Sequence, residues 1–276
     1  MSRLWNRPRF DLVELLATAL LVGLCVWYVD RKASQPASRY WDDVTLREVA
    51  RLRAAYGPDR YSANEEEWII RDFFKDRRGG FFVDVGASHY RDDSNTYYLD
   101  SRLGWSGIAI DPQATLEASY RMYRPRTRFF PLFVSDSSND TARLYMAGRG
   151  SLSASGDRDF ARLFGKDVSE SVVPTTTLTD LLTRLQVGRI DLLSVDVELS
   201  EPKVLAGFDI DRFKPALVCI EAHPDVRQQI LDYFATHAYV AVGRYLRVDV
   251  QNLYFTPLGP ARSPADGSGW TGEGPH

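Results

Sequence analysis

A glycine turn, followed by an acid at the end of the next apolar run, is the feature that best indicates chemistry. The apolar run 81–85 opens at Gly86 into a turn of small residues, and a second run, 106–110, ends on Asp111. A glycine in the turn has no Cβ, so the backbone can approach a ligand closely. An acid at the end of the second run can accept hydrogen bonds from ribose hydroxyls. The spacing therefore predicts a nucleotide-type site.

The turn does not fit a dinucleotide. Folds that bind NAD or FAD place further glycines after the first one, and this chain has Ser88, His89 and Tyr90 there. The pattern argues against a pyrophosphate cradle and favours an adenosyl ligand without pyrophosphate. A nicotinamide oxidoreductase is therefore the weakest of the functions considered.

These residues need a sheet whose strands end at one edge. Further strands are predicted at 128–134, 190–197, 216–221, 239–247 and 251–256, and helices at 44–56, 114–123, 177–186, 201–206 and 225–237. Because strands and helices alternate, the sequence predicts an α/β fold, a doubly wound, mainly parallel, seven-stranded Rossmann-like sheet. The last two strands form a predicted hairpin that puts an antiparallel strand at one edge.

Two segments stand outside this alternation. Ser62-x-x-Glu65 is a capping box that predicts the start of a helix before the first strand. Residues 142–173 interrupt the alternation with a possible strand at 142–146 and a Gly/Ser-rich loop at 148–159, which could border a substrate.

Four sequence blocks carry a resemblance to a known family. They are EEEWIIRDFFKDRRGGFFVDVGASH (65–89), DSNTYYLDSRLGWSGIAIDP (93–112), PTTTLTDLL…GRIDLLSVDVELSEPKVLAGFD (174–209) and PALVCIEAH (215–223). In content and order they resemble the FkbM-type S-adenosylmethionine-dependent methyltransferases. The third block differs at one position, because the family has Gly after its Asp-Val-Glu and this chain has Leu199.

The resemblance implies S-adenosyl-L-methionine as cofactor. It also implies O-methylation of a hydroxyl on a sugar, a glycan, or a lipid-linked or secondary-metabolite acceptor. Cofactor contacts are expected from polar and small residues at or after the ends of the first three strands. These are Asp84, Gly86, Ala87, Ser88, His89, Asn95, Asp111, Ser135 and Asp136.

Methyl transfer to a hydroxyl needs alignment of donor and acceptor and one general base. The candidates follow the fourth and fifth strands: Asp196, Glu198, Glu221 and His223. We prefer His223, because an imidazole titrates near neutral pH, although a His before Pro can also be a satisfied loop residue. Asp196 and Glu198 alternate on one strand, so one is expected to enter the pocket. The other would cap the next helix or pair with a basic residue.

The same four residues could hold a metal ion. Their oxygen and imidazole donors suit Mg²⁺ or Mn²⁺. Because the sequence does not fix their mutual distances, we predict no metal site.

The N-terminal segment is predicted to attach the chain to a membrane. Residues 10–29 are apolar over nearly membrane length, with Asp11 and Glu14 close to the start of the segment. A retained single-pass anchor is the preferred interpretation. A signal peptide with Arg3, Arg7 and Arg9 as its basic region is one rival, and an amphipathic or buried helix is the other. The cofactor is made in the cytosol, so the catalytic domain is expected to be cytoplasmic.

The predicted organisation has four parts. Residues 1–32 are the anchor, 33–60 a linker with an accessory helix, 61–258 the methyltransferase domain, and 259–276 a disordered Gly/Pro/Ser-rich tail.

Composition limits the kinds of partner to expect. The formal net charge is −3, and no basic run interleaves with aromatic residues, which argues against a nucleic-acid partner. A small-molecule, sugar or lipid-linked acceptor is expected. The two cysteines have no metal-site spacing, and they suggest a reducing compartment. The alternative from another class is a non-catalytic scaffold on a decayed methyltransferase fold. Leu199 and the absence of the Gly that the family has a few residues beyond the first-strand turn are the arguments for it.

Overall fold

The computed structural model describes residues 43–147 and 154–259. The chain divides into two compact units, Met1–Arg47 and Glu48–His276. Of the first unit, only the first residues of helix α2 (Asp43–Tyr56) are described. The predicted anchor and almost all of the predicted tail lie outside the described residues. Within the described part of the chain, none of the helices combines the length and the apolar character that a bilayer crossing requires.

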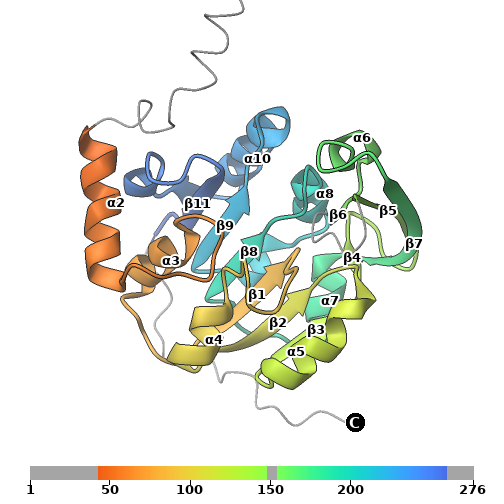
Figure 1. Ribbon diagram of the computed structural model, residues 1–276, viewed down its shortest axis with the longest axis horizontal. Helices are drawn as coiled ribbons and strands as arrows, with labels where there is room; N and C mark the ends of the chain where they lie inside the picture. Colours follow the sequence, from red (N-terminus) through yellow and green to blue (C-terminus); the bar gives the residue numbers. More distant parts are fainter. Residues whose placement is uncertain (1–42, 148–153, 260–276) are drawn as a thin grey trace, which may run out of the picture. The chain divides into compact units, whose positions relative to one another are not determined.

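Seven strands form the main sheet, in the order β10-β11-β9-β8-β1-β2-β3 (Figure 1). They are β1 (Phe81–Val85), β2 (Ser106–Ile110), β3 (Thr127–Phe130), β8 (Leu192–Val195), β9 (Leu217–Glu221), β10 (Tyr239–Ala241) and β11 (Asn252–Pro257). From β9 to β3 all neighbours pair in parallel. The predicted seven-stranded, mainly parallel α/β sheet is therefore confirmed, and the carboxyl ends of β1, β2, β8 and β9 share one edge.

The place of the antiparallel strand differs from the prediction. β11 is antiparallel to both β9 and β10, so it lies inside the sheet and β10 takes the edge. All of the first four residues of β11 are buried, whereas β10 has only Tyr239 buried. A strand with both faces covered belongs inside a sheet. The predicted strand 239–247 also ends early, at Ala241, before the 3₁₀ turn η3 (Gly243–Tyr245).

Helices cover both faces of the sheet. On one face lie α7 (Leu178–Arg184), α8 (Glu201–Ala206), α9 (Ile210–Phe213) and α10 (Pro224–Thr236). On the other lie α2 from Glu48 onward, α3 (Glu66–Phe74) and α4 (Tyr97–Leu103), with α5 (Glu117–Tyr123) over β2 and β3. Side chains along β1 point alternately to the two faces of the sheet. Val83 therefore packs against the helices of the first face and Phe82 against those of the second. Both faces are apolar, as in a doubly wound sheet.

A second, four-stranded sheet follows β3. It contains β4 (Phe133–Val134), β5 (Thr141–Ala147), β6 (Ala154–Ser155) and β7 (Val168–Thr176), in the order β4-β7-β5-β6, with the short helix α6 (Arg158–Ala161) after β6. The predicted strand 128–134 is divided between the two sheets at Pro131, which has no N–H to continue the ladder. The chain therefore leaves the main sheet beside the edge where the strands end.

The predicted capping box is wrong in its detail. Helix α3 begins at Glu66, and the Ser62 hydroxyl accepts from the Glu67 backbone N–H at 3.0 Å rather than from that of Glu65. The Glu67 carboxylate in turn accepts from the Tyr61 N–H at 2.8 Å, so both bonds hold the helix start, at Glu67 and not at Glu65.

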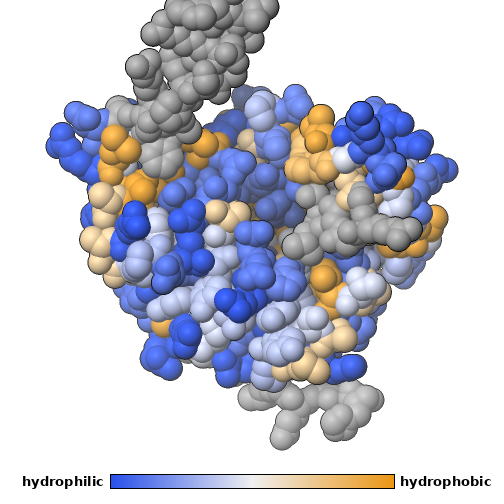
Figure 2. Space-filling view, viewed as in Figure 1, coloured by the Kyte–Doolittle hydropathy of each residue, from blue (hydrophilic) through white to orange (hydrophobic). Residues whose placement is uncertain are grey.

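On the face seen in Figure 2, hydrophilic residues predominate and hydrophobic residues form scattered patches.

Candidate active site

The turn after β1 requires glycine. Gly86 has φ of 81°, and a Cβ there would lie 1.6 Å from the backbone oxygen of Asp196. The N–H groups of Gly86 and Ala87 both donate to the Ile110 carbonyl, at 2.8 and 3.1 Å. The turn is thus held between the ends of β2 and β8, and only a residue without a side chain fits it.

Asp111, directly after β2, is held by backbone donors. Its Oδ2 accepts from the Ser88 N–H at 3.1 Å and its Oδ1 from the Gln113 N–H at 2.9 Å. Burial raises the pKa of Asp111 to about 6, and the two N–H donors oppose that rise. Each oxygen of a carboxylate accepts more than one hydrogen bond. Asp111 can therefore accept hydrogen bonds from two ligand hydroxyls while it keeps its bonds to the two backbone N–H groups.

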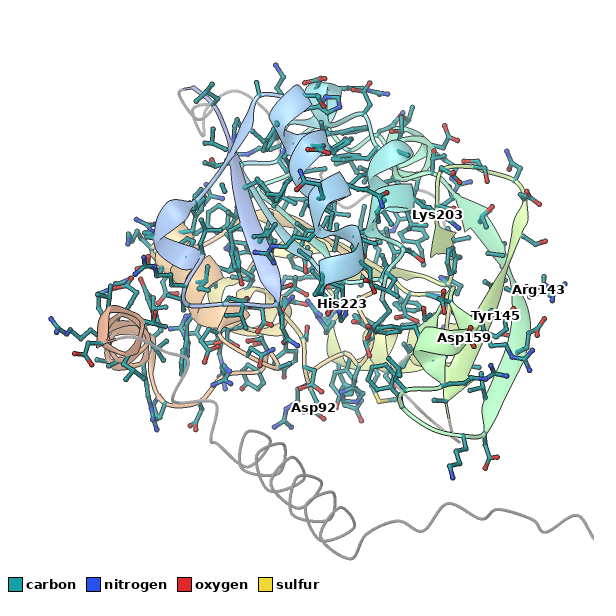
Figure 3. All side chains as sticks on the ribbon, turned by 90° about the horizontal axis from the view of Figure 1, so that it is seen from above. Asp92, Arg143, Tyr145, Asp159, Lys203 and His223 are labelled. Atoms are coloured by element: carbon teal, nitrogen blue, oxygen red, sulfur yellow. The ribbon has the colours of Figure 1, made fainter. Side chains whose placement is uncertain are left out.

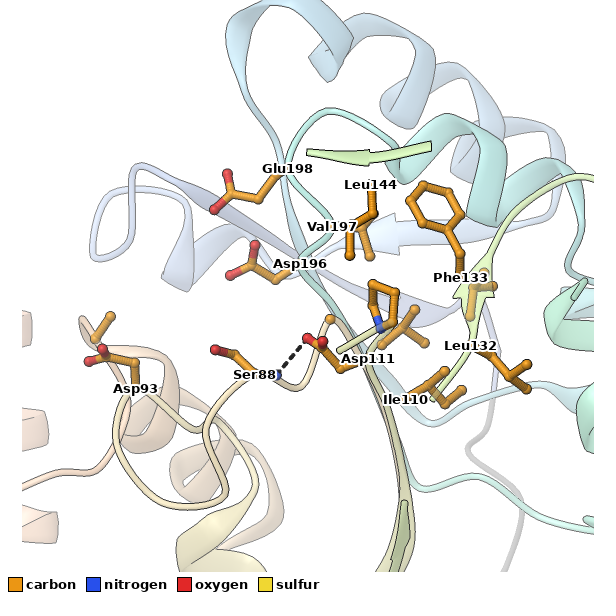
Figure 4. Close-up of a pocket in the computed structure, with 15 residues that line it drawn as sticks. Ser88, Asp93, Ile110, Asp111, Leu132, Phe133, Leu144, Asp196, Val197 and Glu198 are labelled. Carbon is orange, nitrogen blue, oxygen red and sulfur yellow. Dashed lines mark hydrogen bonds between the residues drawn. The ribbon is translucent and has the colours of Figure 1, made fainter. Parts of the chain in front are cut away.

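A pocket of about 210 Å³ opens at this edge of the sheet. Its residues are Ala63, Val85, Gly86, Ser88, Asp93, Ile110, Asp111, Pro112, Leu132, Phe133, Val134, Leu144, Asp196, Val197 and Glu198. Figure 4 shows Asp93, Asp196 and Glu198 on one side of Asp111 and Leu132, Phe133 and Leu144 on the other. The pocket thus has an apolar wall, a central acid and an acidic side. This suits a ligand that combines an aromatic base, a ribose and a cationic centre.

Of the nine predicted cofactor contacts, Gly86, Ser88 and Asp111 line the pocket. Asp84 does not line the pocket. Its Oδ2 accepts from the Thr96 hydroxyl at 2.6 Å, and burial raises its pKa. Asn95 donates to the Ser194 hydroxyl at 3.2 Å. These bonds indicate that Asp84 and Asn95 support the turn, and a direct contact with a ligand stays a prediction.

The other four predicted contacts also lie away from the pocket wall. Ala87 is buried and its carbonyl accepts from the Tyr120 hydroxyl, whereas the His89 ring accepts from the Asp92 N–H. Ser135 and Asp136 follow β4 and bond to each other, the Ser135 hydroxyl donating to Asp136 Oδ1 at 3.1 Å. Because the chain turns into the second sheet at Pro131, the residues facing the pocket are 132–134 instead.

The segment after β8 brings two acids into the same pocket. Strand β8 ends at Val195, and Glu198 and Leu199 have φ of 54° and 74°. Alternation therefore stops, and both Asp196 and Glu198 line the pocket. Neither acid caps the next helix, but the other predicted role is found for Glu198, whose Oε2 lies 3.8 Å from Nε2 of His223. Ser200 precedes that helix, and Glu201, its first residue, accepts through Oε1 from the Val197 N–H at 3.1 Å.

Glu221 and His223 stand next to these acids, at the end of β9. His223 Nε2 lies 3.1 Å from Glu221 Oε1 and 3.8 Å from Glu198 Oε2. The His223 ring packs edge-on against Phe160 of α6, with centroids 5.2 Å apart. Figure 3 shows His223 where β9 passes into α10, while Arg143 and Tyr145 of β5 lie at the outer side. All four predicted catalytic residues are thus brought together, but only Asp196 and Glu198 line the pocket.

The four carboxyls Asp196, Glu198, Glu201 and Glu221 raise one another's proton affinity. Burial raises the pKa of Glu198 and of Glu201 to about 7. Solvent reaches Asp196 through the pocket, yet surrounding protein and then the Glu198 charge raise its pKa as well. Burial and then the Asp196 charge also raise the pKa of Glu221. Together these carboxyls hold protons more readily than isolated surface carboxyls do.

Sequence reasoning missed two acids and the apolar wall. Asp93 lines the pocket from the loop before α4, in a left-handed conformation with φ of 59°. Glu201 is fully buried beside Asp196. A signal existed for Glu201, since three acids crowd the segment DVELSE. Leu132, Phe133 and Leu144 gave no signal, because the second sheet alone brings them here.

Comparison of the chain with known protein families gives a match that covers the site. The profile of a family described as "Methyltransferase FkbM domain" matches residues 84–251, more than half of the 276 residues. This range contains every residue predicted above for cofactor binding and catalysis. No curated protein matches the chain.

Three solved structures show a distant likeness to this chain. A TehB-like SAM-dependent methyltransferase from Corynebacterium glutamicum is 14% identical, with 77% of this chain and 95% of that chain covered and a TM-score of 0.39. A methyltransferase from Geobacter sulfurreducens is 14% identical, with 86% and 97% covered and a TM-score of 0.36. A Pyrococcus horikoshii protein assigned as an RNA methyltransferase is 12% identical, with 78% and 98% covered and a TM-score of 0.36. These likenesses are too distant to carry a conclusion about substrate.

Proposed function

The chain belongs to the FkbM methyltransferase family, and on that premise we propose that it is an O-methyltransferase. Its cofactor is S-adenosylmethionine. The proposed acceptor is a hydroxyl on a sugar, a glycan, or a lipid-linked or secondary-metabolite molecule. The acceptor class rests on the sequence resemblance to the FkbM type, and the reaction type on the acids that surround the pocket.

The single observation that carries the proposal is the placement of Asp111 between an apolar and an acidic wall. S-adenosylmethionine supplies a methyl group on a positively charged sulfonium. Leu132 and Phe133 offer a surface for the adenine, and Asp111 accepts from the ribose hydroxyls. Asp93 and Asp196 provide negative charge on the side where the sulfonium would lie. The residues present therefore fit the cofactor in polarity and in charge.

Asp196 is the residue we propose as general base. It lines the pocket and is reached by solvent there. The surrounding protein and then the Glu198 charge raise its pKa toward neutrality, as suits a base at physiological pH. His223, preferred from the sequence, has its Nε2 turned toward Glu221 at 3.1 Å and does not line the pocket. His223 and Glu221 are then supports of the acceptor site.

The alternative of an inactive scaffold loses its main argument. It rested on Leu199 in place of the family's Gly. Leu199 adopts φ of 74°, the left-handed conformation that a glycine would favour. The segment thus has a backbone that a glycine would also favour, and Asp196 and Glu198 line the pocket beside it. This supports an active enzyme.

Asp196→Asn tests the base. It keeps the shape of the side chain but cannot take a proton, so single-turnover methyl transfer should fall about 10²–10⁴-fold. In the wild-type protein, transfer should increase as the pH rises through neutrality, because the base must be ionised and its pKa is raised. The variant should lack this rise.

The acceptor itself can be found by comparing metabolites of wild-type and deletion strains for a product that lacks one methyl group.

Two controls make this test specific. S-adenosylhomocysteine affinity should stay nearly unchanged in Asp196→Asn, and Asp180→Asn, an exposed acid on α7, should have normal turnover. Full activity in folded Asp196→Asn would move the base to Glu198, which also lines the pocket.

A further inference from the structure

Three donor atoms beside the pocket have the spacing of a metal site. One ligand atom each from Glu198, Glu221 and His223 lie within 4.8 Å of one another. The three residues come from two neighbouring strand ends, since Glu198 follows β8 and the other two lie at the end of β9. The parallel pairing of β8 and β9 brings these two strand ends together, and Glu198 and His223 lie in the segments directly beyond them.

One buried oxygen in this group lacks a partner. Only 9% of Glu221 is exposed, and its Oε2 has no hydrogen-bond donor among the described residues. Glu201, with 0% exposed, has a second such oxygen, Oε2, beside the same group. Buried carboxylate oxygens are normally satisfied, so each unpartnered oxygen calls for an explanation.

The charge of the group is also not balanced by the protein. In the described part of the chain, the ion pairs of Glu198 and Glu221 are both with His223, and no Lys or Arg joins them. Asp196 and Glu201 add two more carboxyls nearby. Carboxylates at this density are stable in a protein when a cation or shared protons neutralise them.

We propose that Glu198, Glu221 and His223 hold a divalent cation, Mg²⁺ or Mn²⁺, at the acceptor side of the pocket. Two carboxylates and one imidazole form a mixed oxygen and nitrogen set that suits these ions. Three protein ligands leave further coordination positions open, so an acceptor oxygen can bind there.

The cation extends the proposed function and rests on it for its role. A hydroxyl bound to the cation loses its proton more easily, and Asp196, which lines the same pocket, receives that proton. The acceptor oxygen then forms the new O–CH₃ bond while the S–CH₃ bond of the donor breaks, which leaves S-adenosylhomocysteine. His223 is a ligand in this scheme, which agrees with its ring nitrogen facing the two carboxylates.

Manganese binding to the purified full-length protein tests the site directly. Electron paramagnetic resonance titration with Mn²⁺ should detect one bound ion, and Mg²⁺ should displace it. Glu221→Gln and His223→Ala should each weaken Mn²⁺ binding at least about tenfold. His237→Ala is the matched control, because His237 also pairs with an acid, Asp211 at 2.7 Å, but on an exposed surface. It should bind Mn²⁺ as the wild type does.

The outcomes distinguish a failure of the cation site from a failure of the proposed methyltransferase function. Thermal melts identify variants that do not fold, and Glu198→Gln, on a half-buried segment, provides a further variant that should weaken binding. No Mn²⁺ binding at millimolar concentration, or equal binding in all folded variants, would overturn the cation site. If S-adenosylhomocysteine still binds the same sample, the proposed methyl transfer survives that result. Mn²⁺ binding without S-adenosylhomocysteine binding would instead keep the cation site and overturn the proposed function.

Discussion

Leu199 is a large apolar residue in a backbone conformation that favours glycine. Its φ is 74°, directly after Glu198 at 54°. A left-handed conformation costs a non-glycine residue roughly 1–2 kcal/mol. The side chain packs, half-buried, against the main core and offsets this cost. The strain is located where the chain turns two acids into the pocket, as strained residues at functional sites often are.

Comparing two substitutions at this position isolates the strain. Leu199→Gly and Leu199→Ala both lose the packing of the side chain, but only Ala retains a Cβ in the left-handed conformation. We therefore expect the free energy of unfolding to be higher for Leu199→Gly than for Leu199→Ala, by about 1 kcal/mol. Urea denaturation of the two variants measures this difference. Equal stability, or a more stable Ala variant, would show that the backbone at this position is not strained.

At the scale of elements, the turn between β1 and α4 determines the shape of the pocket, because it packs directly against the end of β8. Gly86→Ala places a Cβ against the Asp196 carbonyl, so β8 and the turn must separate. Gly57 is the matched control, because it has φ of 94° and a Cβ there would meet no other atom within 4 Å. Gly57→Ala should cost about 1–2 kcal/mol for its conformation alone. Gly86→Ala should cost clearly more and also weaken S-adenosylhomocysteine binding.

Thermal melts and calorimetry on both variants check this prediction. A Gly86→Ala variant as stable as Gly57→Ala, with normal cofactor affinity, would mean that the turn can move away from β8 without consequence.

The strands that position the site could be predicted from the sequence because their signals are local. The strands β1, β2, β8 and β9 are short apolar runs that end in polar residues, and each lies within about two residues of its predicted bounds. The inner position of β11 could not be predicted, because it depends on pairing with β9 and β10 together. The break at Pro131 was likewise missed, and with it the move of Ser135 and Asp136 away from the pocket. Asp111 was placed correctly because it needs only β2 and the Gly86 turn.

For the whole molecule, attachment to a membrane through residues 10–29 remains a proposal that rests on the sequence. Full-length protein should stay with the membrane fraction after a carbonate wash, whereas a chain that begins at Ser38 should not. A mature form that lacks residues 1–30 would show that the segment is a cleaved signal peptide. That result would also separate the domain from the cytosolic supply of S-adenosylmethionine.

The central claim is that the pocket at the ends of β1, β2 and β8 binds the cofactor through Asp111. Calorimetric titration of S-adenosylhomocysteine into the full-length wild type, Asp111→Ala and Asp136→Ala tests it most directly. Loss of a charge-assisted hydrogen bond costs about 1.5–3 kcal/mol, so affinity should fall roughly ten- to a hundredfold in Asp111→Ala. Asp136, exposed and away from the pocket wall, should be replaceable without effect. Unchanged affinity in a folded Asp111→Ala variant would contradict the account.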